Sequence, residues 1–499
     1  MKIIKYLIIT FVSILILIAI SIPLLNNFLV NTIENQLIKA NSKNLTITPG
    51  AIEIDILKRN IKLKNTKINY VTVTENGNVI LPEIHIYGIQ PNSYKKPDSI
   101  TIDSLTIVKA LYSQKKQDSI NIDTKTKKST LPYIAINSLK IIKAKHIVQD
   151  KNSDTTLHTK SLNLTISKLN YNTNSKEKIA IDSYSYDIDS IHTPLDDFEK
   201  LYIENIKGDS TTMKITNLQI RPTYSKEEMS ALLKKEKDWI DLKVRSLVIH
   251  NQKLNFKDET IQIKADSIEI DNAKLSVYRD KQIADDHSYK PLYSKKLREL
   301  NFPILIPKIK LNNGSIEYEE RIQNNGKPGM ITFTELKGTI YDINNTGINN
   351  NTTIDLTTKF MGHAPFTFHW NFNIADKTDY FKMKGELHNL TAASINQFTL
   401  PNLNVQCTGH IDHVYFDISA NDYKAQGKYL MDYKNFKIEI EKKNENQINK
   451  FLSNIANIFI KTNKDNLKEV HIDVKRDPEK SFFNFLWLCV KQGTLHSVT

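Results

Sequence analysis

The sequence of 499 residues contains only two cysteines, Cys407 and Cys489. A disulfide framework is therefore excluded, although one bridge between these two cysteines stays open. Arginine is also scarce, and the lysines that give the chain its formal net charge of +13 are dispersed along its length. Dispersed lysines indicate a solvated surface or attraction to an anionic membrane. Nucleic-acid binding is not expected, because the basic residues do not cluster.

Motifs that mark common enzyme and cofactor sites are absent: the chain has no Gly-x-Ser-x-Gly, His-Glu-x-x-His, Walker loop or dinucleotide fingerprint. The best histidine grouping is His410, Asp412 and His413. On a strand, His410 and Asp412 share one face while His413 points away, which is poor geometry for a metal. His363 and His369 accompany aromatic residues and are interpreted as surface and packing residues. We therefore expect no catalytic residue, no metal and no cofactor.

Long apolar runs are rare too, and only residues 6–25 approach the length that crosses a bilayer. This run carries no charge, and a helix of twenty residues spans about 30 Å of hydrocarbon. A cleaved signal peptide is the alternative, but the run does not end in the small residues of a cleavage site. Two lysines among residues 1–5 predict a cytoplasmic N-terminus. The predicted anchor includes Tyr6, Phe11, Leu17 and Leu25.

Residues 26–41 continue with apolar side chains at every third or fourth position, which predicts an amphipathic helix. This helix would either lie on the outer leaflet or plug the open end of the structure that follows. From residue 42 the apolar period changes to two, as in Ile52-Glu53-Ile54-Asp55. The same alternation returns at residues 100, 134, 242 and 268, with a three-residue step in each repeat. Such steps predict β-bulges or tight turns, since a slip of one residue would otherwise reverse every side chain.

The pattern predicts a mainly β protein with an N-terminal transmembrane helix, a long repetitive antiparallel sheet and a few packing helices. One face of the sheet is apolar. A second layer covers that face in one interpretation, whereas in the other it is an open, curved groove for acyl chains. The first interpretation is favoured by physics alone, because large exposed apolar patches are rare.

Helices are predicted at four places after residue 42. A capping box at Ser225–Glu228 opens one that runs to about Ile240, and a short one covers Tyr293–Leu300. An apolar stripe predicts a third helix over Asn446–Ile460, followed by a strand over 465–475. The last helix follows Pro478 and either docks on the sheet or contacts a membrane or partner; its apolar side includes Phe482, Phe485, Leu486 and Trp487.

These elements divide the chain into nine predicted segments. They are a cytoplasmic start (1–5), an anchor (6–25), an amphipathic helix (26–41), a first β region (42–223), a helix (224–240), a second β region (241–390), a third β region (391–443), a helix plus strand (444–475) and a C-terminal helix (476–499).

Three stretches together resemble a known family. They are the anchor with the amphipathic helix and strands that follow it, the middle block from Tyr224-Ser225-Lys226 through Gly329-Met330-Ile331-Thr332-Phe333, and the end Arg476-Asp477-Pro478 with the aromatic residues after it. Together they resemble the AsmA-like envelope proteins of Bacteroidetes, which are related to TamB and to bridge-like lipid-transfer proteins. The resemblance implies a single-pass protein of the bacterial inner membrane with its body in the periplasm.

The resemblance favours the groove over the covered sheet, and it implies phospholipid transport without catalysis. The implied partners are phospholipids, the inner membrane and an outer-membrane or envelope protein at the C-terminal end. A closed envelope scaffold that binds a membrane protein is the main alternative, and a periplasmic hydrolase with two carboxylates across a cleft is another. The wall expected to face acyl chains consists of Ile134, Ile136, Leu139, Ile141, Leu247, Ile249, Ile268 and Ile270.

Overall fold

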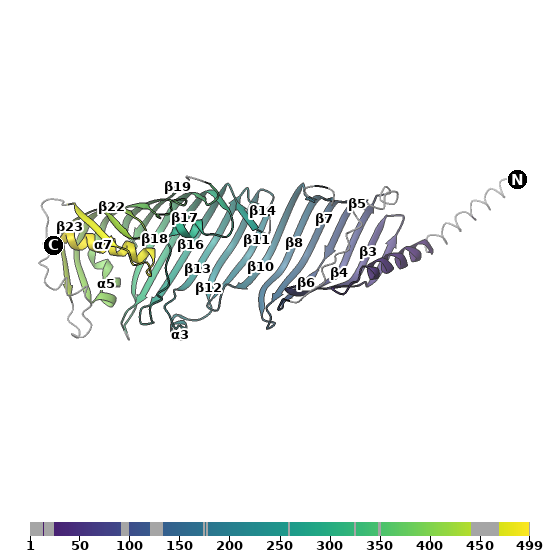
Figure 1. Cartoon of the computed structure of the whole chain (residues 1–499), viewed down its shortest axis with the longest axis horizontal. Coiled ribbons are helices and arrows are strands. Elements are labelled where there is room, and N and C mark those ends of the chain that lie inside the picture. The colour runs from purple at the N-terminus through teal and green to yellow at the C-terminus, as the bar shows by residue number, and fades with distance from the viewer. Residues whose placement is uncertain are drawn as a thin grey trace. The chain divides into compact units, whose positions relative to one another are not determined.

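The computed structural model describes residues 13, 24–90, 99–119, 133–172, 175, 178–257, 260–323, 326–347, 351–440 and 469–498. Contacts divide the chain into two compact units. Unit 1 comprises Met1–Pro194 and Ile203–Ser210, and unit 2 comprises Leu195–Tyr202 and Thr211–Thr499. Both units are mainly β, as the sequence predicts (Figure 1). Strand β11 (Glu199–Asp209) contributes residues to both.

Unit 1 opens with a helix over 24–39, in agreement with the predicted amphipathic helix. In its sheet, β1 and β2 both pair with β3, and β3 pairs with β4. β4 pairs with β5 and with β6, and both of these pair with β7. β7 pairs with β8, which in turn pairs with β9 and β10. The strands are β1 (Leu45–Thr48), β2 (Ala51–Asp55), β3 (Asn60–Val71), β4 (Glu75–Ile89), β5 (Ser99–Val108), β6 (Leu111–Lys116), β7 (Tyr133–Gln149), β8 (Thr155–Asn172), β9 (Ile179–Ala180) and β10 (Ser183–Pro194).

In unit 2 the pairing order is β12, β13, β16, β17 and then β18 to β24 in sequence, with the β14–β15 hairpin extending β13 and β16. The strands are β12 (Thr212–Pro222), β13 (Trp239–His250), β14 (Lys253–Lys257), β15 (Thr260–Lys264), β16 (Ser267–Asp280), β17 (Ile304–Arg321), β18 (Gly329–Asn344), β19 (Asn351–Phe360), β20 (Ala364–Asn373), β21 (Phe381–Thr391), β22 (Val405–Ala420), β23 (Lys424–Ile440) and β24 (Val470–Lys475). The helices are α3 (Lys226–Leu232), α4 (Tyr293–Arg298), η1 (Ala392–Ile395), α5 (Asn396–Leu403) and α7 (Phe482–Val498).

The strands are not all antiparallel, which corrects one expectation. β7 runs parallel to β5 and β6, and β17 runs parallel to β15 and β16. Parallel neighbours need a connection long enough to return to the starting edge. Residues 117–132 and 281–303 provide the two connections, and the second contains α4. The sheets are therefore mixed.

The predicted step at Asp271-Asn272 has an unusual backbone but no register shift where β13 pairs with β16. Val244 lies opposite Ala273 and Ser246 opposite Asp271, so Arg245 and Asn272 are passed together. Register shifts occur elsewhere, for example between Leu311 and Gly314 of β17 where it pairs with β18. Asn272 has φ of 53°, and Asn217 in the neighbouring strand β12 has φ of 49°. Asparagine tolerates this left-handed backbone better than most residues do. Neither strand carries an extra residue here, and the pairing continues beyond the step with Leu247 opposite Ile270.

The capping box of α3 is present, with the Ser225 side chain and the Glu228 side chain each bonded to the other's backbone N–H. The helix ends much earlier than expected, however, at Leu232 rather than near Ile240. Trp239 instead begins β13, where it pairs with Tyr278 and donates from Nε1 to the Tyr224 carbonyl at 2.9 Å. Strand pairing thus overrides the helical propensity of the lysine-rich segment.

The short helix near Tyr293, the strand before Lys475 and the helix after Pro478 are all present as α4, β24 and α7. The helix predicted over Asn446–Ile460 lies outside the described residues, as does most of the predicted anchor, including Tyr6, Phe11 and Leu17. In the part of the chain that the structure describes, no helix has the length and apolar character needed to cross a membrane.

Candidate functional site

In unit 1, side chains directly opposite each other on neighbouring strands form two continuous apolar rows. Directly paired residues share a face of a sheet, so the register alone defines these rows. The first row runs Ile52, Leu63, Ile84, Ile107, Ile141, Leu164 and Tyr186; the second runs Ile54, Ile61, Ile86, Leu105, Leu139, Ile166 and Tyr184. The predicted wall residues Leu139 and Ile141 belong to these rows, and Ile134 and Ile136 on β7 lie opposite Ile100 and Ile102 of β5.

Unit 2 carries two rows of the same kind from β13 to β24, which we call its apolar rows. One consists of Ile249, Ile268, Ile309, Ile340, Ile354, Trp370, Met383, Ile418, Gly427 and Ile472; the other consists of Leu247, Ile270, Leu311, Gly338, Leu356, Phe368, Gly385, Phe416, Tyr429 and Val470. The four remaining wall residues, Leu247, Ile249, Ile268 and Ile270, start these rows. Every predicted wall residue therefore lies opposite an apolar side chain of a neighbouring strand.

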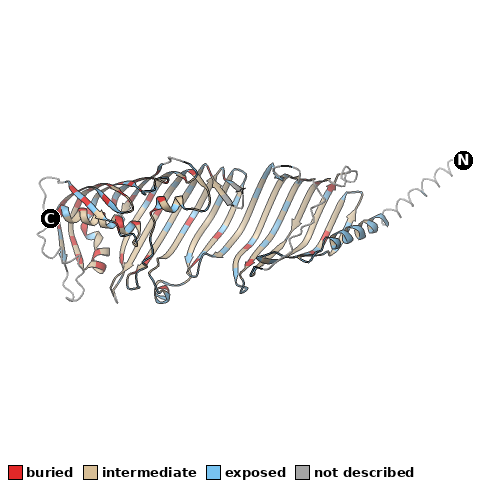
Figure 2. Cartoon of the chain, viewed as in Figure 1, coloured by how far each residue is buried: buried red, intermediate tan, exposed pale blue. Residues whose placement is uncertain are grey.

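Burial differs sharply along the apolar rows of unit 2 (Figure 2). Ile249, Ile270 and Ile354, on β13 to β19, are only half-buried. From β20 onward most side chains of the same rows are sealed: Met383 and Ile418 are 0% exposed, although Phe368 on β20 is still half-buried. A side chain enclosed between two layers loses nearly all contact with water, so partial exposure indicates that the described residues form no second layer over β13 to β19.

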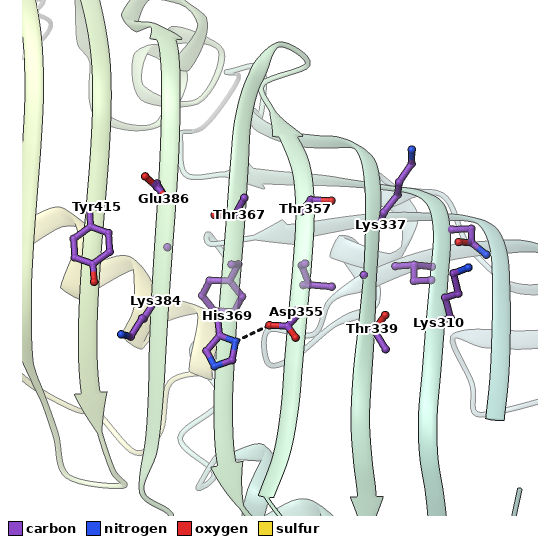
Figure 3. A pocket seen from close by; sticks show the side chains of 16 residues that line it. Lys310, Lys337, Thr339, Asp355, Thr357, Thr367, His369, Lys384, Glu386 and Tyr415 are labelled. Atoms are coloured by element: carbon purple, nitrogen blue, oxygen red, sulfur yellow. Dashed lines mark hydrogen bonds and ion pairs between the residues drawn. The ribbon is translucent and has the colours of Figure 1, made fainter. Parts of the chain in front are cut away.

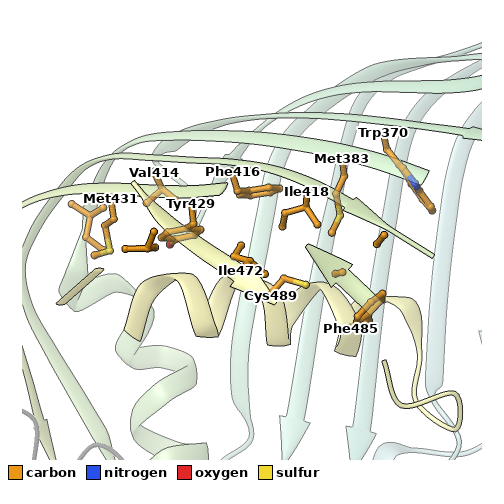
Figure 4. Close-up of a cluster of buried hydrophobic side chains, with 14 of the residues drawn as sticks. Trp370, Met383, Val414, Phe416, Ile418, Tyr429, Met431, Ile472, Phe485 and Cys489 are labelled. Carbon is orange, nitrogen blue, oxygen red and sulfur yellow. The ribbon is translucent and has the colours of Figure 1, made fainter. Parts of the chain in front are cut away.

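The sealed end is covered by α7, which contacts β23 and β24. Figure 4 shows this helix beneath the strands, with Phe485 and Cys489 directed toward the cluster. The Phe482 ring stacks on Trp370 with centroids 4.3 Å apart, and Tyr429 Oη lies 2.8 Å from Thr494 Oγ1. Gly493 is required here, because a Cβ at this position would come within 2.3 Å of the Tyr429 ring.

A buried arginine holds the segment that leads into α7. Arg476 is fully buried and donates hydrogen bonds to the Asp422 carboxylate and to the Lys290 carbonyl. The Lys290 N–H in turn donates to the Pro478 carbonyl at 2.8 Å. This arginine begins the C-terminal motif that carried part of the family resemblance, so that motif acts structurally at this position.

The predicted C-terminal side chains divide between two environments. Phe482 and Phe485 are buried in the covered cluster and Leu486 packs against it, so α7 docks on the sheet. Trp487 is 39% exposed and lies 6.1 Å from the Phe398 ring, while Phe483 is 65% exposed. Of the predicted anchor residues, only Leu25 is described, and it is exposed on the helix over 24–39.

The two cysteines are both free and buried, so the bridge left open by the sequence is not formed. Cys407 lies on β22 and Cys489 on α7. Burial raises the pKa of the Cys407 thiol to about 11 and that of Cys489 to about 12. Both therefore act as small apolar core residues rather than as nucleophiles.

The opposite face of the unit 2 sheet is polar and carries a hollow of about 620 Å³. It is lined by strand triplets such as Lys384-Gly385-Glu386, whose outer residues face the hollow while the middle residue belongs to an apolar row (Figure 3). His369 Nδ1 and Asp355 Oδ1 lie 2.6 Å apart on its floor, which agrees with the surface position expected for His369.

The histidines were grouped incompletely from the sequence. His410 and Asp412 do share a face, with 3.4 Å between Nε2 and Oδ1. His413 instead lies with Glu386 and His388, and these three form the only group of potential metal ligands found among the described residues. Only a Glu-x-His spacing on β21 hinted at this group, because its pairing with His413 depends on strand register.

No protein-family profile and no curated protein matches this sequence.

Proposed function

We propose that the chain is a non-enzymatic lipid carrier of a bacterial envelope, whose apolar rows hold the acyl chains of phospholipids. The observation that carries this proposal is the open stretch of the apolar rows on β13 to β19, which is contiguous in register with the sealed end. A continuous apolar surface left in contact with water is costly for a soluble protein unless it receives an apolar ligand or partner.

The dimensions of the open stretch suit an acyl chain. The five neighbouring strands β13, β16, β17, β18 and β19 span about 19 Å at the usual strand spacing of about 4.8 Å. One leaflet of a bilayer contributes about half of a hydrocarbon core roughly 30 Å thick, so a single chain fits within the stretch. The open rows are aliphatic, as in Ile268, Ile309 and Leu356, which provides a smooth surface without polar atoms.

The proposed location is the inner membrane, with the anchor at residues 6–25 and the body in the periplasm. The uncharged run of these residues and the lysines before it support this orientation. Phospholipids and the inner membrane are then the first partners of the chain.

Site-specific photo-crosslinking tests the proposal. A benzophenone amino acid at Ile249 should capture phospholipid in cells, whereas the same residue at Val248 should not. Val248 directly precedes Ile249 on β13 and lies opposite Lys214 and Glu269 on the polar face, so it is a matched control. Mass spectrometry of the purified protein identifies the adduct. Equal capture at both positions, or no capture at Ile249, would refute lipid binding by this face.

A second candidate function is that of an envelope scaffold that binds a protein partner through α7. The exposed rings of Phe483 and Trp487 favour it, since large apolar side chains on a docked helix often mark an interface. Deletion of α7 would destroy the core, so the double variant Phe483→Ser, Trp487→Ser is the appropriate test. Loss of a crosslinked protein partner with unchanged lipid capture at Ile249 would support the scaffold over the carrier.

A further inference from the structure

Three side chains that commonly bind metals converge on the polar face of β21 and β22. Glu386 and His388 are two residues apart on β21 and so face the same side, and His413 on β22 lies directly opposite His388. One ligating atom from each residue lies within 4.8 Å of the other two. Strand pairing therefore places a carboxylate and two imidazoles at one point.

The ring orientations bring the ligating atoms together. Glu386 Oε1 lies 3.0 Å from His413 Nε2 and 3.3 Å from His388 Nε2. The two imidazole rings stack with centroids 4.6 Å apart and an interplanar angle of 14°. Tetrahedral Zn²⁺ with ligands at about 2.0–2.1 Å separates neighbouring ligand atoms by roughly 3.4 Å, so small side-chain rotations suffice to admit the ion.

The charges and exposure of the group also suit a cation. The exposed side-chain fractions of His413, His388 and Glu386 are 30%, 44% and 45%, so an ion from water can reach them. The neighbouring ammonium groups are paired elsewhere: Lys384 with Asp417 and Lys434 with Asp412, each at 3.0 Å. Glu386 is thus not neutralised by a lysine in the structure described.

We propose that Glu386, His388 and His413 form a site for a divalent transition-metal ion, with Zn²⁺ as the reference ion. Two imidazoles and one carboxylate are a set that Zn²⁺ uses when one coordination position stays open. Mg²⁺ and Ca²⁺ prefer oxygen ligands alone and should bind poorly. Glu386 also lines the hollow of Figure 3, so the proposed site lies at the edge of that hollow. The bound ion links β21 to β22.

The test uses the full chain purified in detergent and stripped of metal with a chelator. Isothermal titration calorimetry measures Zn²⁺ binding to each protein. The wild type should bind one more equivalent of Zn²⁺ than His388→Ala or His413→Ala does, or bind Zn²⁺ at least about 10-fold more tightly. The control is His369→Ala on β20, which removes a histidine of the same face that pairs with the single carboxylate of Asp355. This control should bind as the wild type does.

Zn²⁺ should also raise the melting temperature of the wild type and of His369→Ala, but not that of His388→Ala. Circular dichroism verifies that the variants fold, which their half-exposed positions lead us to expect. The proposal is refuted if the wild type takes up no Zn²⁺, or if both histidine variants bind Zn²⁺ as the wild type does. In that case the three side chains form an ordinary ion-pair cluster.

Discussion

The apolar rows of unit 2 contain two regions that differ in burial. On β13 to β19 the rows are half-buried, whereas on β20 to β24 most of their side chains are buried and α7 packs against β23 and β24. Strand pairing is continuous through both regions. Alternation of apolar residues therefore defines a face of a sheet but does not show whether another layer covers it.

The residue types differ between the regions in a way that explains the coverage. The open rows are built from isoleucine and leucine, whereas the covered rows contain Trp370, Phe416 and Tyr429. Large rings provide more area for a helix to bury. Glycine makes room for them: a Cβ at Gly385 would lie 2.1 Å from the Phe416 ring.

A buried charge should separate the two regions most strongly. Ile418→Asp places a carboxylate where the side chain is 0% exposed, and we expect loss of at least about 4 kcal/mol or failure to fold. Ile270→Asp on the open rows should fold. All three tryptophans belong to unit 2, so their fluorescence during denaturation follows this unit. Equal destabilisation by both variants would mean that the open rows are also a closed core.

Truncation of apolar side chains should show the same contrast at lower magnitude. Phe485→Ala removes a ring that is 2% exposed, and we expect a loss of about 3–5 kcal/mol in the free energy of unfolding. Ile309→Ala on the open rows should cost only about 1 kcal/mol, because the isoleucine is only partly buried before the change. Denaturant titration of both variants measures the difference, and comparable losses would contradict it.

Thiol reactivity provides a non-perturbing comparison. Cys407 and Cys489 should not react with iodoacetamide at pH 8 in the folded protein, since burial raises both thiol pKa values, to about 11 and about 12. A cysteine introduced by Ile270→Cys should react at least ~100-fold faster, because an accessible thiol has a pKa near 8.5. Phospholipid should slow this labelling if it occupies the open rows. Labelling of Cys489 at the same rate as the introduced cysteine would show that α7 does not seal its end.

The smallest effect on the free energy of unfolding is expected for the ion pair between Lys480 and Asp285, which precedes α7. Lys480 Nζ lies 2.6 Å from Asp285 Oδ2, and this hydrogen bond lowers the pKa of the Asp285 carboxyl. Lys480→Met should cost no more than about 1 kcal/mol, since both groups are partly solvated. A lowered pKa stabilises the fold above the unfolded value near 4, and that contribution is lost as the pH falls. The difference between wild type and variant should therefore shrink on acidification; a difference that grows would contradict this assignment.

Much of the fold follows from local sequence. Period-two alternation predicts strands such as β2 and β16, and the step at Asp271-Asn272 marks the left-handed backbone of Asn272, because side-chain direction depends only on the backbone of neighbouring residues. The capping box at Ser225 predicts where α3 begins. The end of α3 is not predicted, since Trp239 is drawn into β13 by pairing with a strand that lies later in the chain.

The candidate sites likewise contain features that the local sequence predicts and features that depend on distant contacts. The sequence by itself determined which side chains share an apolar face, as for Leu247 and Ile249, because alternation within one strand is a local property. Only the tertiary structure decided that α7 seals one end of that face, and that His413 lies beside His388. Both depend on contacts between distant segments, whose geometry is set by register and packing.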